Sequence, residues 1–187
     1  MNWRTLMAVV GLCGAIVTAS FSSAPVAAQQ RVAAHWDEAT LSTPTFTVRM
    51  EHNVKVPMRD GVALSADIYI PDRAGRYPTL LWRTPYSNNT AVSVTQSRWY
   101  AERGYVVVQQ DVRGKYDSDG EFYTYRHEAD DGYDTDEWIG KQPWSDGKIG
   151  LMGGSYLGYT ALTQAIRGSK YVTAMAASVT TSDIHNN

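Results

Sequence analysis

Cysteine is nearly absent from this sequence, whose 187 residues include only Cys13. That residue lies in a segment that we expect to be removed. The remaining chain then has no internal disulfide, no thiolate zinc site and no cysteine nucleophile. Any covalent catalysis must use another side chain.

An excess of positive charge is also lacking. Lys and Arg number 17 against 19 Asp and Glu, which gives a formal net charge of -2. Proteins that bind nucleic acid or coat anionic lipid present basic patches, so we expect neither partner. The chain is 43% apolar and 19% charged, which is typical of one globular domain and excludes a fibre or a disordered tail.

The N-terminus has the pattern of a secretory signal peptide over residues 1–28. Arg4 is its only charge, an apolar run covers residues 6–19, and small residues lead to Ala28, after which we expect cleavage. The alternative is a membrane anchor, but the run is shorter than the ~20 residues that span a bilayer. We therefore expect an exported protein, periplasmic or extracellular, with no membrane attachment after cleavage.

Hydrophobic periodicity predicts an α/β fold after a polar lead-in arm at residues 29–44. Two β-rich stretches, 46–56 and 62–70, flank Asp60-Gly61 and predict an antiparallel hairpin. Further strands are expected at 79–82, 105–108, 148–152 and 172–179, and helices at 94–103, 128–142 and 159–166. Their alternation predicts a mostly parallel sheet with helices on both faces.

The segment most informative about chemistry is Gly153-Gly154-Ser155-Tyr156-Leu157-Gly158, between a predicted strand and a predicted helix. A sharp turn there raises the Ser155 hydroxyl above the sheet, and the glycines let the chain turn tightly and the helix pack closely. The helix N-terminus then faces the oxyanion, with the Tyr156 N–H as one donor. The usual pattern has glycine where Leu157 stands, so a plain connecting turn remains an alternative.

Other polar groups are interpreted as structural. Asp111 and Arg113 follow a predicted strand and are expected to form an ion pair that fixes a loop. Residues 127–131, with one histidine and three acids, are read as a solvated helix start, and 117–121 as a turn without calcium-loop spacing. Residues 88–90 form a formal N-glycosylation acceptor. We expect no metal and no other cofactor.

Motifs in a fixed order run along the chain: 83–86 (Arg-Thr-Pro-Tyr), 111–114, 118–121, 134–135, 138–139, 143–144, 147–150 and 153–158. In this order and spacing they resemble the cocaine-esterase and X-Pro dipeptidyl-peptidase family of α/β-hydrolases. That family tolerates another residue where Leu157 stands and has glycine at the next position. The likeness covers about residues 48–187. It implies that 45–187 form the N-terminal part of a catalytic domain, truncated after about the sixth strand.

The resemblance also implies roles for individual residues. Ser155 is the expected nucleophile, and the Tyr86 hydroxyl and the Tyr156 backbone N–H are the expected oxyanion donors. The implied reaction is hydrolysis of an acyl ester or amide, in a small molecule or short peptide, through an acyl-enzyme. Esterase and X-Pro dipeptidyl-peptidase activities both fit.

The acid and histidine of the triad are expected outside this chain. In this fold both follow the serine along the sequence, and only Asp183 and His185 do so here. Their spacing cannot place the acid behind the imidazole while the ring faces Ser155. The resemblance places both partners further on, so we expect residues 1–187 alone to be inactive.

Two alternatives remain open. One is an α-amino-acid ester hydrolase or β-lactam acylase, although such relatives often carry glutamate where Leu157 stands. The other belongs to a different class and is a truncated binding module without catalytic activity. A downstream reading frame with an acid and a later histidine would favour an enzyme.

Overall fold

The structure, a computed structural model, describes residues 41–181. The predicted signal peptide, residues 29–40 of the predicted arm, and Asp183 and His185 lie outside the described residues. Residues 41–44, the rest of the arm, are exposed and belong to no helix or strand. Within 41–181, no helix is long and apolar enough to cross a membrane.

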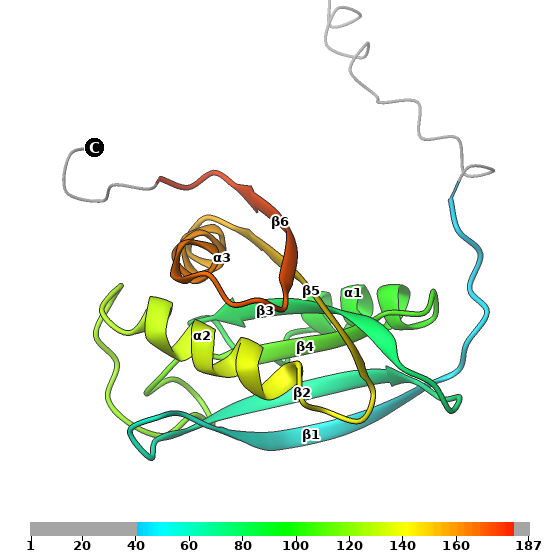
Figure 1. The fold of residues 1–187 in the computed structure, drawn as a ribbon, viewed down its shortest axis with the longest axis horizontal. Coiled ribbons are helices and arrows are strands. Elements are labelled where there is room, and N and C mark those ends of the chain that lie inside the picture. The colour runs from blue at the N-terminus through cyan, green and yellow to red at the C-terminus, as the bar shows by residue number, and fades with distance from the viewer. Residues whose placement is uncertain (1–40, 182–187) are drawn as a thin grey trace, which may run out of the picture. The chain divides into compact units, whose positions relative to one another are not determined.

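Residues 41–181 form one mixed sheet of six strands in the order β1-β2-β4-β3-β5-β6 (Figure 1). β2 pairs antiparallel with both β1 and β4, and the pairs from β4 to β6 are parallel. In chain order the elements are β1 (Val48–Pro57), β2 (Ala63–Pro71), β3 (Tyr77–Thr84), α1 (Ala91–Ala101), β4 (Val106–Asp111), α2 (Glu128–Ile139), β5 (Ser145–Gly154), α3 (Tyr156–Arg167) and β6 (Val172–Ser178). The predicted α/β class is confirmed.

The hairpin at the start of the sheet forms at the predicted turn. Gly61 has φ 85°, a left-handed conformation that favours glycine. The Met58 N–H donates to the Val62 carbonyl at 2.8 Å and closes the turn. The pairing of β1 with β2 shifts its register between Glu51 and Val54.

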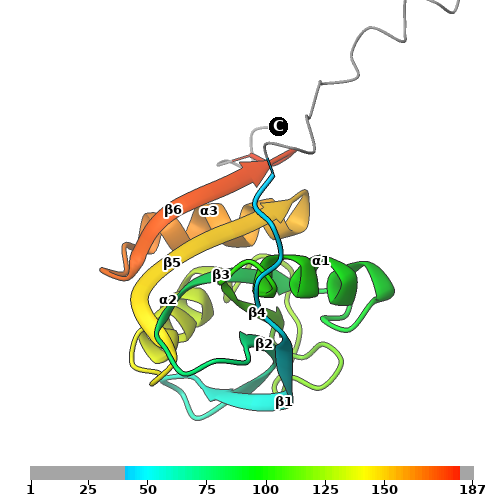
Figure 2. The ribbon, with the colours of Figure 1, turned by 90° about the vertical axis from the view of Figure 1, so that its right-hand side faces the viewer.

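Helices cover both faces of the sheet, as the alternation predicted (Figures 1 and 2). α2 and α3 pack on one face through Ile139 and Ala161, and α1 packs on the other through Ala101. Successive strand residues point to opposite faces. Val107 therefore reaches the α1 side, while Val108 joins the core under α2 and α3.

The central strand β4 is longer than its apolar stretch predicted, because its polar end is buried and paired. The Gln109 side chain donates to Ser97 Oγ at 3.1 Å on the α1 side. Gln110 Oε1 accepts from Arg83 at 2.8 Å and from Thr135 at 3.1 Å on the other side. A change from apolar to polar residues was therefore a wrong indicator of the end of this strand.

The helix boundaries differ from the prediction by a few residues. α1 begins earlier, because Thr90 Oγ1 accepts from the Ser93 N–H at 3.1 Å and caps the helix. α2 ends at Ile139, before Gly140. α3 begins at Tyr156, directly after the turn at Ser155.

Candidate active site

The predicted site residues lie together beyond the carboxyl-terminal ends of the parallel strands β3, β4, β5 and β6. Tyr86 comes two residues after β3, and Ser155 follows β5 directly. Val179 follows β6. Ligand sites of open α/β sheets form outside the carboxyl ends of the strands.

Ser155 lies on a strained turn between β5 and α3, with φ 55° and ψ -123°. A non-glycine residue with positive φ is uncommon and costs about 1–3 kcal/mol, so the surrounding structure must impose it. The Ser155 N–H donates to the Ser178 carbonyl at 3.0 Å, and its carbonyl accepts from the Tyr159 N–H at 3.0 Å. These bonds hold the turn, while Ser155 itself is exposed.

Two glycines allow this turn to pack tightly, as the sequence predicted. A Cβ at Gly153 would collide with the carbonyl oxygen of Leu157. A Cβ at Gly158 would lie 2.8 Å from the Ser178 carbonyl oxygen on β6. Leu157 itself packs on the α1 side of the sheet with Met152, so a side chain larger than glycine fits there.

A pocket of about 440 Å³ opens beside Ser155. Tyr125 forms part of its wall, and its ring stacks on Tyr156 at a centroid distance of 4.9 Å and meets the edge of Tyr159 at 4.5 Å. Tyr125 has φ 66°, so this loop residue is also held in the left-handed region. The full lining is Tyr125, Ser155, Tyr156, Tyr159, Val179, Thr180 and Thr181.

Sequence reasoning missed Tyr125 and Tyr159. Residues 122–125 contain three aromatics, Phe122, Tyr123 and Tyr125, and this density was the one available signal. Which of the three rings turns towards Ser155 depends on the backbone of an irregular loop. Periodicity carries no information about such a loop.

Tyr86 lies beside Tyr156, with ring centroids 6.3 Å apart and an interplanar angle of 73°. Its side chain is 57% exposed, which excludes a packing role beneath the sheet. The Tyr86 N–H donates to Thr84 Oγ1 at 3.0 Å, so the loop is fixed directly after β3. The structure therefore brings together the two residues predicted to hold the oxyanion.

The Tyr156 side chain is anchored inside the protein. It is 7% exposed, its hydroxyl donates to Glu128 Oε1 at 2.7 Å, and it accepts from the Tyr125 N–H at 3.3 Å. Burial, followed by the nearby negative charge of Glu128, raises the pKa of the Tyr156 phenol. The hydroxyl therefore stays protonated and bonded to Glu128. The predicted oxyanion donor of Tyr156 is its backbone N–H and not this hydroxyl.

The predicted ion pair between Asp111 and Arg113 is wrong, because the two side chains bind different elements. Arg113 contacts Asp131 at 2.6 Å and Asp60 at 2.7 Å, which joins α2 to the hairpin turn. Asp111 Oδ1 instead accepts from the Asn88 N–H at 2.8 Å. Burial raises the pKa of Asp111 to about 7.

Of the three acids at the start of α2, only Asp130 is solvated as the sequence suggested. Glu128 and Asp131 are 3% and 2% exposed, and their carboxylates face Arg83 and Arg113. Burial became possible because each carboxylate has a cationic partner. Among residues 41–181, no group of three His, Cys, Asp or Glu side chains is placed to hold a metal ion.

The asparagine of the formal glycosylation acceptor at residues 88–90 is buried in this fold. Asn88 is 3% exposed, and its side-chain amide donates to the Gln109 carbonyl at 3.4 Å. Thr90 is occupied as the cap of α1. These positions stabilise the loop between β3 and α1.

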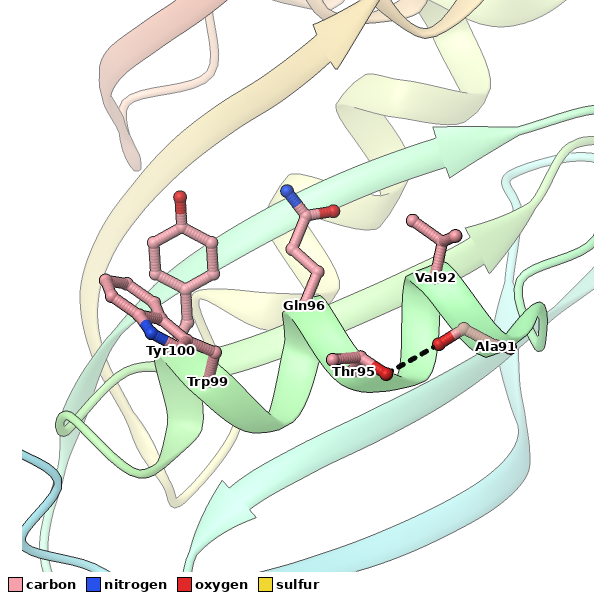
Figure 3. A pocket seen from close by; sticks show the side chains of 6 residues that line it. All are labelled: Ala91, Val92, Thr95, Gln96, Trp99 and Tyr100. Atoms are coloured by element: carbon pink, nitrogen blue, oxygen red, sulfur yellow. Dashed lines mark hydrogen bonds between the residues drawn. The ribbon is translucent and has the colours of Figure 1, made fainter. Parts of the chain in front are cut away.

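A larger pocket of about 710 Å³ lies along α1, on the opposite face from α2 and α3 (Figure 3). Its lining is Ala91, Val92, Thr95, Gln96, Trp99 and Tyr100. The Thr95 hydroxyl donates to the Ala91 carbonyl at 2.8 Å, along the helix itself. The pocket contains no predicted nucleophile or oxyanion donor, so the candidate active site is the smaller pocket at Ser155.

Comparison with known proteins identifies the family. The family described as X-Pro dipeptidyl-peptidase (S15 family) matches residues 60–187, which include Tyr86 and Ser155. The chain belongs to the S15 family. Cocaine esterase of Rhodococcus sp. (strain MB1 Bresler) is 42% identical over 137 residues, which cover 71% of this chain and 24% of the esterase.

Solved structures agree with the S15 assignment and with the α/β-hydrolase fold. A CocE/NonD family hydrolase from Staphylococcus aureus has a TM-score of 0.63 at 28% identity, over 68% of this chain and 27% of the hydrolase. An α-amino acid ester hydrolase has a TM-score of 0.61 at 28% identity, over 72% and 26% of the two chains. The chain thus spans about a quarter of the length of these relatives.

Proposed function

We propose that this chain supplies the nucleophile of an exported serine hydrolase that opens acyl esters or amides through an acyl-enzyme on Ser155. The observation that carries the proposal is an exposed serine held at φ 55° between a strand and a helix, beside a pocket. Membership of the S15 family supports the reaction class.

In the proposed reaction Ser155 Oγ attacks the substrate carbonyl carbon, and its proton passes to a histidine. The carbonyl oxygen becomes an oxyanion, which the Tyr86 hydroxyl and the Tyr156 N–H stabilise. The leaving alcohol or amine takes the proton from the histidine, and water then hydrolyses the acyl-enzyme. We propose that the histidine and its acid lie beyond Asn187, and that residues 1–187 alone are inactive.

For the substrate we favour a small ester over an X-Pro peptide. The 42% identical relative is named as an esterase, whereas the family description names a dipeptidyl-peptidase. The side chains that line the described pocket carry no charge, so this wall suits a neutral acyl group. The similar α-amino acid ester hydrolase keeps that activity as the second candidate.

The proposal is tested with a fluorophosphonate probe on the gene product that extends beyond residue 187. We expect labelling that Ser155→Ala abolishes without changing the melting temperature, and that the exposed control Ser42→Ala retains. Labelling that persists in Ser155→Ala would place the nucleophile elsewhere. An unlabelled, folded protein would favour the non-catalytic binding module.

A further inference from the structure

Beneath the turn at Ser155, a buried chain of polar contacts joins three elements. Arg83 comes from β3, Glu128 is the first residue of α2 and Tyr156 is the first residue of α3. Arg83 Nη1 donates to the Glu128 carbonyl at 2.7 Å, and Nη2 lies 3.3 Å from Glu128 Oε2. The other carboxylate oxygen, Oε1, accepts the Tyr156 hydroxyl at 2.7 Å.

Burying these charged side chains costs free energy, so their contacts call for a role beyond stabilising the fold. Arg83 and Glu128 are 1% and 3% exposed, and a buried ion pair often stabilises a fold no better than apolar residues of similar volume would. The contacts of this pair join β3 to the start of α2, and from there to the start of α3. They fix the start of α2 against the start of α3.

Both proposed oxyanion donors belong to, or closely follow, residues that make these buried polar contacts. Tyr86 follows Arg83 by three residues, and the Tyr156 N–H belongs to the residue whose hydroxyl Glu128 holds. Thr160, one turn along α3, has its hydroxyl 3.2 Å from the Arg83 carbonyl and 2.9 Å from the Leu157 carbonyl, which share its one proton. Arg83 and Glu128 therefore set the position of α3 relative to the end of β3.

We propose that Glu128 is a positioning residue of the oxyanion site. By holding the Tyr156 hydroxyl, it fixes the first turn of α3 and with it the Tyr156 N–H, and Arg83 holds Glu128 in place. The inference rests on the proposed function of Ser155. It assigns Glu128 no contact with substrate.

Tyr156→Phe is the cleanest test, because it removes only the hydroxyl, with its bonds to Glu128 and to the Tyr125 N–H, and keeps the backbone N–H, the ring and the ion pair beneath. Complete loss of an oxyanion donor costs about 10²–10³ in kcat, and a displaced donor a fraction of that. We expect kcat of the full-length protein to fall about 10-fold with KM changed less than about twofold. Tyr133→Phe, elsewhere on α2, is the control and should leave both unchanged.

Glu128 variants test the other end of the bond. Glu128→Gln can keep an oxygen for the Tyr156 hydroxyl but then turns its NH2 group towards Arg83 Nη2, so we expect a kcat between those of the parent and of Glu128→Leu. Glu128→Leu should lose at least as much as Tyr156→Phe. The double variant Glu128→Leu/Tyr156→Phe should be little slower than Glu128→Leu, because both changes break the Glu128–Tyr156 contact and Tyr156→Phe removes in addition only the 3.3 Å bond to the Tyr125 N–H. Additive losses, or an unchanged kcat in Tyr156→Phe, would overturn the proposal.

A measurement without substrate separates this inference from the proposed function. Amide hydrogen exchange over residues 153–160 should be at least about threefold faster in Tyr156→Phe than in the parent. If Ser155→Ala keeps full activity, the proposed nucleophile is wrong, and faster exchange then supports only that the Glu128 contact orders the first turn of α3. Unchanged exchange in Tyr156→Phe contradicts the positioning role whatever Ser155 does.

Discussion

At the scale of single residues, Tyr86 tests the proposed oxyanion site most directly, because only its hydroxyl is at issue. Tyr86→Phe keeps the ring against Tyr156 and removes the donor. We expect kcat to fall roughly 10²–10³-fold at an unchanged melting temperature. The matched control is Tyr116→Phe, a tyrosine that is 62% exposed, which should keep full activity. Equal kcat in the two variants would remove Tyr86 from the mechanism.

Residue types and spacing predicted some of the site, and the outcome depended on what fixes each side chain. Ser155 was predicted from the strand–turn–helix pattern and Tyr86 from the family resemblance, and the structure places Ser155 directly after β5 and Tyr86 two residues after β3. Arg113 was paired with the wrong partner, since its contacts with Asp60 and Asp131 cross between elements distant in sequence. Long-range contacts of this kind leave no local pattern.

At the scale of elements, the start of α1 depends on one capping bond, which makes it suitable for a stability test. Thr90→Ala removes the acceptor for the Ser93 N–H, and we expect unfolding free energy to fall by about 1 kcal/mol. Thr95→Ala is the control, because that exposed hydroxyl donates to a carbonyl already used within the helix. Its effect should stay within about 0.5 kcal/mol in chemical denaturation. Equal losses in both variants would refute the capping role.

Element types were predictable, and their ends were not. Every predicted strand and helix exists, since hydrophobic periodicity reports which face of an element is buried. The end of β4 was missed because Gln109 and Gln110 are buried with partners from α1, β3 and α2. An end is set by tertiary hydrogen bonds, which the local pattern does not contain.

At the scale of the whole molecule, β6 lies at the end of the described sheet with most of its residues exposed. Met175 is 44% exposed, and an open apolar edge favours pairing between chains. We expect residues 29–187 alone to be poorly soluble and Met175→Lys to raise the soluble fraction. Ile166→Lys also replaces an exposed apolar side chain with lysine, but on α3 and not on the edge strand, and should have a smaller effect. A monodisperse preparation of 29–187 that melts cooperatively would contradict this.

The direction of β1 decides how the protein can be tethered. β1 runs parallel to β4, so it begins at the amino-terminal ends of the parallel strands, whereas Ser155 lies at their carboxyl-terminal ends. At the start of β1, the Phe46 N–H donates to the Glu102 carbonyl at 3.1 Å. An affinity tag or a surface linker joined at Ser42 therefore starts from the side opposite the pocket. Immobilisation through that end should leave the serine free to react.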